Sequence, residues 1–250
     1  VYKRQLNEAN FILAAAQRIE EGSLLFRDMM SYELKLWHPM PFHFRAKPCT
    51  IAYMNSDSCG HISKHDITCV YVCIDGGYKQ QISEFDYSDT HTWGLCCVAE
   101  DFRGTQELIC TTSGPIVFEV DYGNYLGQMP DDSSFVTELY AHAIARIFIL
   151  QHLHKYISCN CIYLDIIYDN KGANILATTS TASGKQPHLT SLCQALDIAV
   201  HKIYPYTNSA HIKSHSLHPW NELSDELCTY ARHRGVERVT EVVRVPLSCL

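Results

Sequence analysis

Three short apolar runs, each closed by glycine, constrain the fold of this chain more than any other feature. They are TCVYVCIDGG (68–77), HTWGLCCVAEDFRG (91–104) and QELICTTSG (106–114), and all are rich in Val, Ile, Cys or Thr, with Trp in the second. Runs of this length and composition between glycines are typical of β-strands. The sequence therefore predicts three consecutive strands that form a β-meander.

The next part of the chain alternates helical and extended patterns. PDDSS (130–134) is a strong helix start, and the run that follows it (135–154) contains no Gly or Pro. CIYLDIIYDN (161–170) is dense in β-branched and aromatic residues, which favours a central buried strand. The remaining predicted elements are a helix after Asn170, helices over 191–204 and 221–233, and a short strand over 209–215. This order predicts a mixed sheet with helices on both faces.

The length and composition predict one core with appendages. The chain has 250 residues, of which 46% are hydrophobic, too few for two full domains. We assign 1–65 to a helical or irregular N-terminal appendage or connection segment, 66–235 to the domain, and 236–250 to a C-terminal tail. The segment 115–129, PIVFEVDYGNYLGQM, is predicted to be an extended insertion within the domain.

Charge and targeting patterns exclude some functions. The formal net charge of -7 argues against binding nucleic acid by bulk electrostatics, so any such contact must be local. The sequence begins with Val1 and shows neither a signal-peptide pattern nor an apolar run of membrane-spanning length. We therefore expect a fragment of a soluble intracellular protein, from the cytoplasm or nucleus, with no membrane partner.

Most of the twelve cysteines lie inside apolar runs, which favours reduced, buried thiols over a disulfide framework. The segment CGHISKHDITC offers zinc-ligand residue types at Cys59, His61, His65 and Cys69. Its spacing matches no common zinc finger, so we interpret this segment as a surface loop.

Four acidic residues fall where strands end or helices begin. Asp75 and Asp169 are placed at strand ends, Glu138 one turn inside the long helix, and Asp225 in the first turns of the last helix. Carboxylates gathered at one edge of such a sheet would repel one another unless cations neutralised them. Hard oxygen ligands predict magnesium or manganese.

Two further acids are alternatives within this set. Asp165 shares a strand face with Asp169, because side chains alternate with a period of two, and it remains a rival third acid. We prefer Asp169 because it lies at the strand end. Asp121 is a rival for Asp75, but only 17 positions separate it from Glu138. Two hairpin strands do not fit into that distance, and we reject Asp121.

These motifs resemble the ribonuclease H domain of retrotransposon reverse-transcriptase polyproteins, in particular the non-LTR, LINE-type elements. VCIDGG around Asp75, TELYA around Glu138, IIYDNKGA around Asp169 and HIKSHSLHPWNELSDELC around Asp225 are similar to its four acidic motifs, in the same order. The resemblance covers roughly residues 68–233. It implies a ribonuclease-H-like α/β fold with a mixed five-stranded sheet, three strands antiparallel and two parallel.

The resemblance also implies a function and a site. Asp75, Glu138, Asp169 and Asp225 would hold two Mg²⁺ or Mn²⁺ ions, and His215, in the loop before Asp225, would be a mobile proton carrier. The expected activity is cleavage of the RNA strand of RNA-DNA hybrids, with a reverse-transcriptase domain of the same polyprotein as a further partner. Ser214 stands where the family often has glycine. The alternative is an inactive ribonuclease-H-like module with a structural or hybrid-binding role.

Overall fold

The computed structural model describes residues 62–79, 91–116, 133–158, 162–180 and 186–234. Several predictions lie outside these residues: the appendage up to residue 61, nearly all of the 115–129 insertion, the tail over 236–250, and Cys59 and His61 of the zinc-like segment. The predicted domain boundaries therefore stay predictions.

Five strands form one sheet with the order β3-β2-β1-β4-β5. The first three strands pair antiparallel, whereas β4 joins β1, and β5 joins β4, in parallel. Their bounds are β1 Ile67–Tyr78, β2 His91–Asp101, β3 Gln106–Pro115, β4 Tyr163–Tyr168 and β5 Thr207–His211. The strand predicted over 209–215 thus starts two residues earlier and ends at His211.

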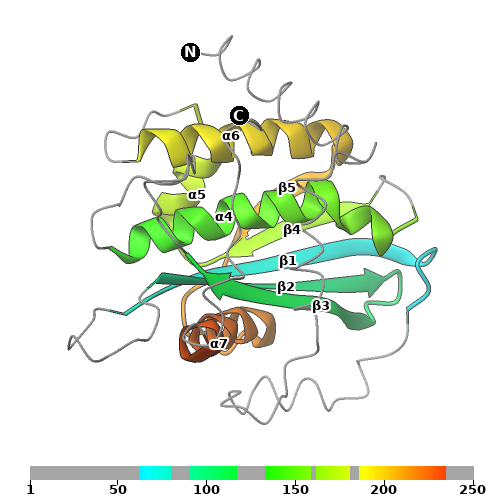
Figure 1. Cartoon of the computed structure of the whole chain (residues 1–250). Coiled ribbons are helices and arrows are strands. Elements are labelled where there is room, and N and C mark those ends of the chain that lie inside the picture. The colour runs from blue at the N-terminus through cyan, green and yellow to red at the C-terminus, as the bar shows by residue number, and fades with distance from the viewer. Residues whose placement is uncertain (1–61, 80–90, 117–132, 159–161, 181–185, 235–250) are drawn as a thin grey trace, which may run out of the picture.

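Helices cover both faces of the sheet (Figure 1). One face carries α4, α5 and α6, and the other carries α7, which contacts β1, β2 and β3. The bounds are α4 Ser134–Gln151, a 3-10 turn at Leu153–Lys155, α5 Lys171–Thr178, α6 Pro187–Ile203 and α7 Pro219–Arg234. The predicted fold class, a mixed five-stranded sheet with three antiparallel strands, two parallel strands and helices on both faces, is confirmed.

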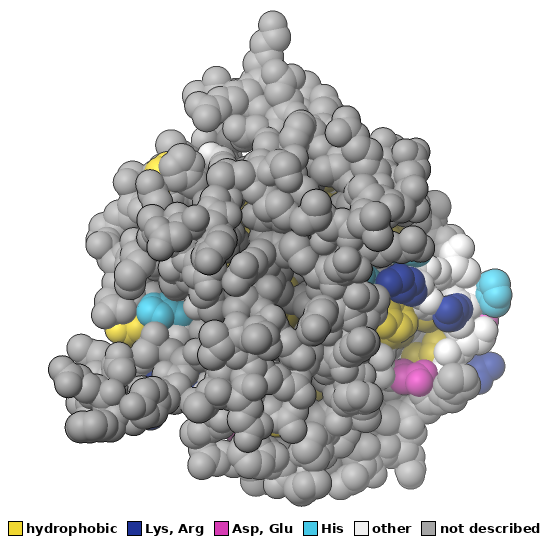
Figure 2. All heavy atoms as spheres, viewed as in Figure 1, with side chains coloured by type: hydrophobic (Ala, Val, Ile, Leu, Met, Phe, Trp, Pro, Cys, Tyr) yellow, Lys and Arg dark blue, Asp and Glu magenta, His cyan; other side chains and the backbone are white. Residues whose placement is uncertain are grey.

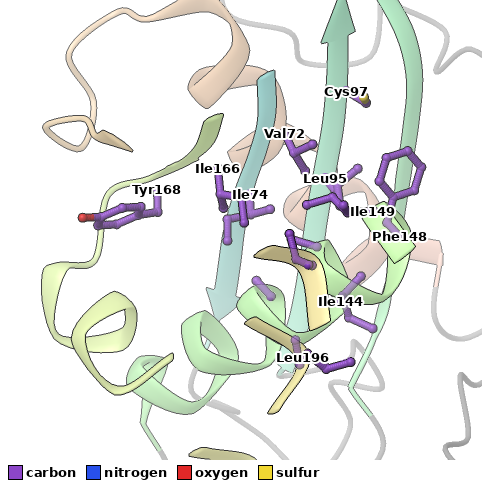
Figure 3. Close-up of a cluster of buried hydrophobic side chains, with 14 of the residues drawn as sticks. Val72, Ile74, Leu95, Cys97, Ile144, Phe148, Ile149, Ile166, Tyr168 and Leu196 are labelled. Carbon is purple, nitrogen blue, oxygen red and sulfur yellow. The ribbon is translucent and has the colours of Figure 1, made fainter. Parts of the chain in front are cut away.

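The central strand β1 contributes side chains to two separate hydrophobic cores, because successive side chains of a strand point to opposite faces of the sheet. Val72 and Ile74 belong to the larger core under α4 and α6, shown in Figure 3. Cys73 lies between them in sequence and belongs to a smaller core under α7, with Trp220 and Leu223. Both faces of β1 are therefore buried, as a central strand requires.

Small residues bring α4 close to the end of β1. A Cβ atom at Gly76 would lie 2.2 Å from the carbonyl carbon of Thr137 and 2.3 Å from the amide nitrogen of Glu138. On the same helix Ala141 and Ala145 are buried against the core. The helix backbone thus rests directly on the strand backbone.

A buried ion pair joins α4 to α6. The side chain of Arg146 is fully buried and donates from Nε and Nη2 to Oδ1 of Asp197, at 3.0 and 2.9 Å. Its Nη1 donates to the carbonyl oxygen of His142 at 3.0 Å. The guanidinium therefore has partners on both helices, which offsets the cost of burying its charge.

The visible surface mixes side-chain types. In the view of Figure 2, described side chains emerge mainly at the right-hand edge, where basic, acidic, histidine and hydrophobic groups lie side by side. Among the described helices, none is both long enough and apolar enough to cross a lipid bilayer.

Candidate active site

Two of the predicted acids lie at the same edge of the sheet. Asp75 is in β1, three residues before its end, and Asp169 directly follows β4. The strands β1 and β4 are parallel neighbours, so their carboxyl ends meet at one edge. Asn170, next to Asp169, caps α5 by accepting a hydrogen bond from the Ala173 amide at 3.1 Å, which fixes the backbone at this point.

Glu138 reaches this edge from α4. The close approach of the helix at Gly76 places its first turns over the end of β1. Carboxylate oxygens of Asp75, Glu138 and Asp169 all lie within 4.8 Å of one another. Three predicted site residues, from three elements, therefore form one cluster.

Asp225 approaches from the opposite face of the sheet, in the second turn of α7. Its Oδ2 lies 3.9 Å from Nδ1 of His215, whose side chain is 75% exposed. Glu222, one turn before Asp225, completes a group in which one atom of each residue lies within 4.8 Å of the others. The loop residues His215 and Leu217 have φ of 52° and 65°, a strained conformation for residues other than glycine.

The electrostatics tie the two groups together. Burial, followed by the charges of Asp169 and Asp225, raises the pKa of Asp75 well above its ordinary value. Burial, followed by the charges of Asp75 and Asp169, does the same to the pKa of Glu138. A hydrogen bond of 2.9 Å from the Gly76 amide to Asp75 opposes the shift. Asp75 thus interacts with Glu138, Asp169 and Asp225, and so links the two groups.

Burial also disfavours the thiolate form of a neighbouring cysteine. Cys228 lies one turn after Asp225 and donates to the carbonyl oxygen of Asp75 at 3.3 Å. Burial, and then the charge of Asp75, raises the pKa of this thiol well above its ordinary value. Cys228 therefore packs α7 onto β1 as a thiol rather than serving as a nucleophile.

The acids line one open cleft of about 810 Å³. Other side chains of its wall are Lys171, His211, Asn221, Thr229 and Arg232. Hard carboxylate oxygens gathered in one cleft, with the pKa values of Asp75 and Glu138 raised, are a donor set that fits a hard divalent cation. The cation would offset their mutual repulsion. Asp75, Glu138 and Asp169 could hold one ion, and Asp225 with Glu222 and His215 a second.

Asp165, the rival third acid, lies elsewhere. It sits in β4 opposite Tyr71 of β1 and Asn208 of β5, and it is not part of the cleft wall. The structure brings Asp169 rather than Asp165 to the other acids. Which residue binds a metal stays a prediction.

Three residues of the site were missed in the sequence. Glu222 is 1% exposed, and it shares a helix face with Asp225 at a spacing of three. Arg232 follows Asp225 by seven positions, again on that face, and Lys171 begins α5 directly after the cap. For Glu222 and Arg232, the signal in the sequence was their helical spacing of three and seven positions from Asp225.

Solved structures similar to this chain include two ribonucleases H1. LC11-RNase H1, isolated from compost by a metagenomic approach, is 15% identical, with a TM-score of 0.46 over 68% of this chain and 99% of its own. Ribonuclease H1 from the halophilic archaeon Halobacterium salinarum is 11% identical, with a TM-score of 0.39 over 65% and 96%. The native prototype foamy virus protease-reverse transcriptase is 14% identical, with a TM-score of 0.43 over 70% of this chain and 22% of that protein.

No protein-family model matches the sequence, and no curated protein is significantly similar to it.

Proposed function

We propose that this protein is a divalent-metal-dependent nuclease that hydrolyses the RNA strand of RNA-DNA hybrids. The observation that carries the proposal is the meeting of four carboxylates, from β1, α4, the end of β4 and α7, in one open cleft. Their order along the chain is the order of the four acidic motifs that resemble ribonuclease H. The proposed context is a polyprotein of a LINE-type retroelement, in which the domain would act beside a reverse transcriptase.

In the proposed reaction, the metal ions and the side chains have separate roles. Bound Mg²⁺ or Mn²⁺ would polarise the scissile phosphate and lower the pKa of a bound water. Asp75 is 7% exposed and Glu138 is half-buried, and the close contact of the β1 backbone with α4 holds their carboxylates in place. Preorganised ligands of this kind do not need to rearrange when the substrate binds.

His215 is placed to move a proton. Its ring is exposed and lies 3.9 Å from Asp225, in a loop that is not part of a helix or strand. An imidazolium in this position can donate a proton to the departing 3' oxygen. The 2'-hydroxyl, read across the minor groove, would distinguish RNA from DNA.

The test is cleavage of a hybrid labelled on either strand, with manganese or magnesium and with chelator. Wild-type protein should cut only the RNA strand, and only with metal. Asp75→Asn and Asp169→Asn should each abolish cleavage, whereas Asp165→Asn, in β4 but outside the cleft, should leave it unchanged.

A folded protein that binds the hybrid without cutting it would favour the alternative, an inactive structural or hybrid-binding module. The net charge of -7 and Ser214 in place of the family's frequent glycine are the features that favour this alternative. Cleavage that survives Asp75→Asn would contradict the proposed metal ligands.

A further inference from the structure

Arg232 lies in the same cleft as the acids. It is seven residues after Asp225 on α7, so both side chains project from one helix face two turns apart. No acidic motif of the sequence includes Arg232. Its place in the wall is set by the packing of α7 against β1 and β2.

The guanidinium is held against main chain at the end of β1. A Cβ atom at Gly77 would lie 3.0 Å from Nη2 of Arg232 and 2.8 Å from Cβ of Cys228. The missing side chain of Gly77 therefore leaves the space that the guanidinium occupies. The guanidinium and the four carboxylates line the same cleft.

Arg232 makes no polar contact within the part of the chain that the structure describes. Its Nε is buried and has no hydrogen-bond partner there, and none of the described carboxylates pairs with it. A guanidinium with unused donors in a cleft that carries four acids would ordinarily form an ion pair with one of them. Because Arg232 lines the cleft, an anion that enters the cleft can meet its guanidinium.

We infer that Arg232 is a positioning residue that binds a backbone phosphate of the nucleic acid next to the cleavage site, an inference that rests on the proposed function. Guanidinium donors match phosphate oxygens in pairs and form short, charge-assisted hydrogen bonds. The chain is acidic overall, so local cations must supply the attraction for phosphate. Arg232 is such a cation, on a rigid helix beside the acids.

The experiment compares wild type with Arg232→Gln and Arg232→Lys. Arg103→Gln is the matched control, since Arg103 is exposed at the β2–β3 turn, at the opposite end of the sheet from Asp75. Hybrid cleavage gives kcat and KM, and fluorescence anisotropy of a labelled hybrid in chelator gives Kd at several salt concentrations. Circular dichroism and melting temperature report the fold of each variant.

Arg232→Gln should raise KM and Kd by roughly tenfold, lower kcat little, and reduce the slope of log Kd against log salt by about 0.9, one phosphate contact. Arg232→Lys should keep the salt slope and recover part of the affinity, because it keeps the charge but not the fork of donors. Arg103→Gln should match wild type.

Unchanged KM, Kd and salt slope in Arg232→Gln would overturn the inference, and so would a fall in melting temperature that accounts for the weaker binding and is repeated in Arg232→Lys. Failure of the proposed function would be distinguishable from failure of this inference, because the wild type itself would then not cut the hybrid. In that event the binding series in chelator still decides whether Arg232 contacts phosphate.

Discussion

His152, at the end of α4, is held neutral by its surroundings. Its side chain is buried, and Nδ1 lies 3.0 Å from Nζ of Lys155. Burial, followed by the charges of Lys155 and His154, lowers its pKa from 6.5 to about 3. The unfolded chain therefore takes up this proton before the folded chain does.

Stability from His152 is thus fully present above pH 6.5 and is lost as the pH falls from 6.5 towards 3. At pH 5 the loss amounts to about 2 kcal/mol, since one pKa unit corresponds to about 1.4 kcal/mol. His152→Gln keeps an acceptor for Lys155 and cannot titrate, so urea unfolding should show a smaller decrease between pH 7 and pH 5 than in wild type. His65→Gln, at an exposed histidine that is not among the causes of this shift, should retain the full decrease. An equal decrease in all three proteins would refute this role of His152.

At the scale of single residues, the sequence predicts the acids of the site better than it predicts the other residues of the site, Glu222 and Arg232. Asp75 and Asp169 stand at strand ends, where the local pattern of apolar residues and glycine or asparagine marks them. Glu222 and Arg232 are set by the rotation of α7 on the sheet, which depends on contacts with distant strands. No local pattern encodes that rotation.

The contact of α4 with β1 depends on Gly76. Because a Cβ atom there would lie 2.2 to 2.5 Å from backbone atoms of Thr137 and Glu138, neither partner can move a side chain to make room. Gly76→Ala should lower the free energy of unfolding by about 1–3 kcal/mol, as overpacked cores do, and displace Glu138 from the acid cluster.

Chemical denaturation and hybrid cleavage together check this prediction. Gly172→Ala is the control, because its nearest neighbour would be the Phe135 ring at 3.3 Å, which can shift, and alanine favours the helix α5. Wild-type stability and cleavage in Gly76→Ala would show that the two backbones do not rest on each other.

The α4–α6 contact depends on a buried charge. Asp197→Ala should cost about 3–5 kcal/mol, because it leaves the fully buried Arg146 guanidinium without its carboxylate. Replacing both, with Arg146→Met and Asp197→Leu, should cost less than Asp197→Ala alone. Urea unfolding of the single and double variants gives the comparison, and additive losses would contradict the buried ion pair.

The order of strands and helices was predictable because each element carries its own periodicity. The strand over 209–215 was the exception, since it ends four residues early. Its last predicted residues include His215, whose positive φ is incompatible with an extended strand. The loop conformation, fixed by the packing of α7, thus decides where the strand ends.

Across the whole molecule, we expect the acid cluster to make stability depend on divalent metal. The raised pKa values of Asp75 and Glu138 mean that their ionised forms destabilise the metal-free fold at neutral pH. Magnesium or manganese at 100 times its dissociation constant should stabilise the protein by about 2.7 kcal/mol through mass action. The melting temperature should therefore rise with metal and fall back with chelator.

Asp75→Asn should change both the melting temperature in chelator and the rise in melting temperature on adding metal. The variant should melt higher than wild type in chelator, because one repelling charge is gone, and it should respond less to metal. Asp165→Asn, outside the cleft, should respond to metal as wild type does. If the melting temperature of the wild type does not change when magnesium or manganese is added, a metal site of this kind is ruled out.

The site is assembled from elements that are far apart in the order of synthesis. Asp75 lies in the first described strand, whereas Asp225 lies in the last described helix, on the opposite face of the sheet. A chain that lacks α7 holds only three of the four acids. Under the proposed function, such a chain would not cleave a hybrid, and cleavage would begin only when α7 docks.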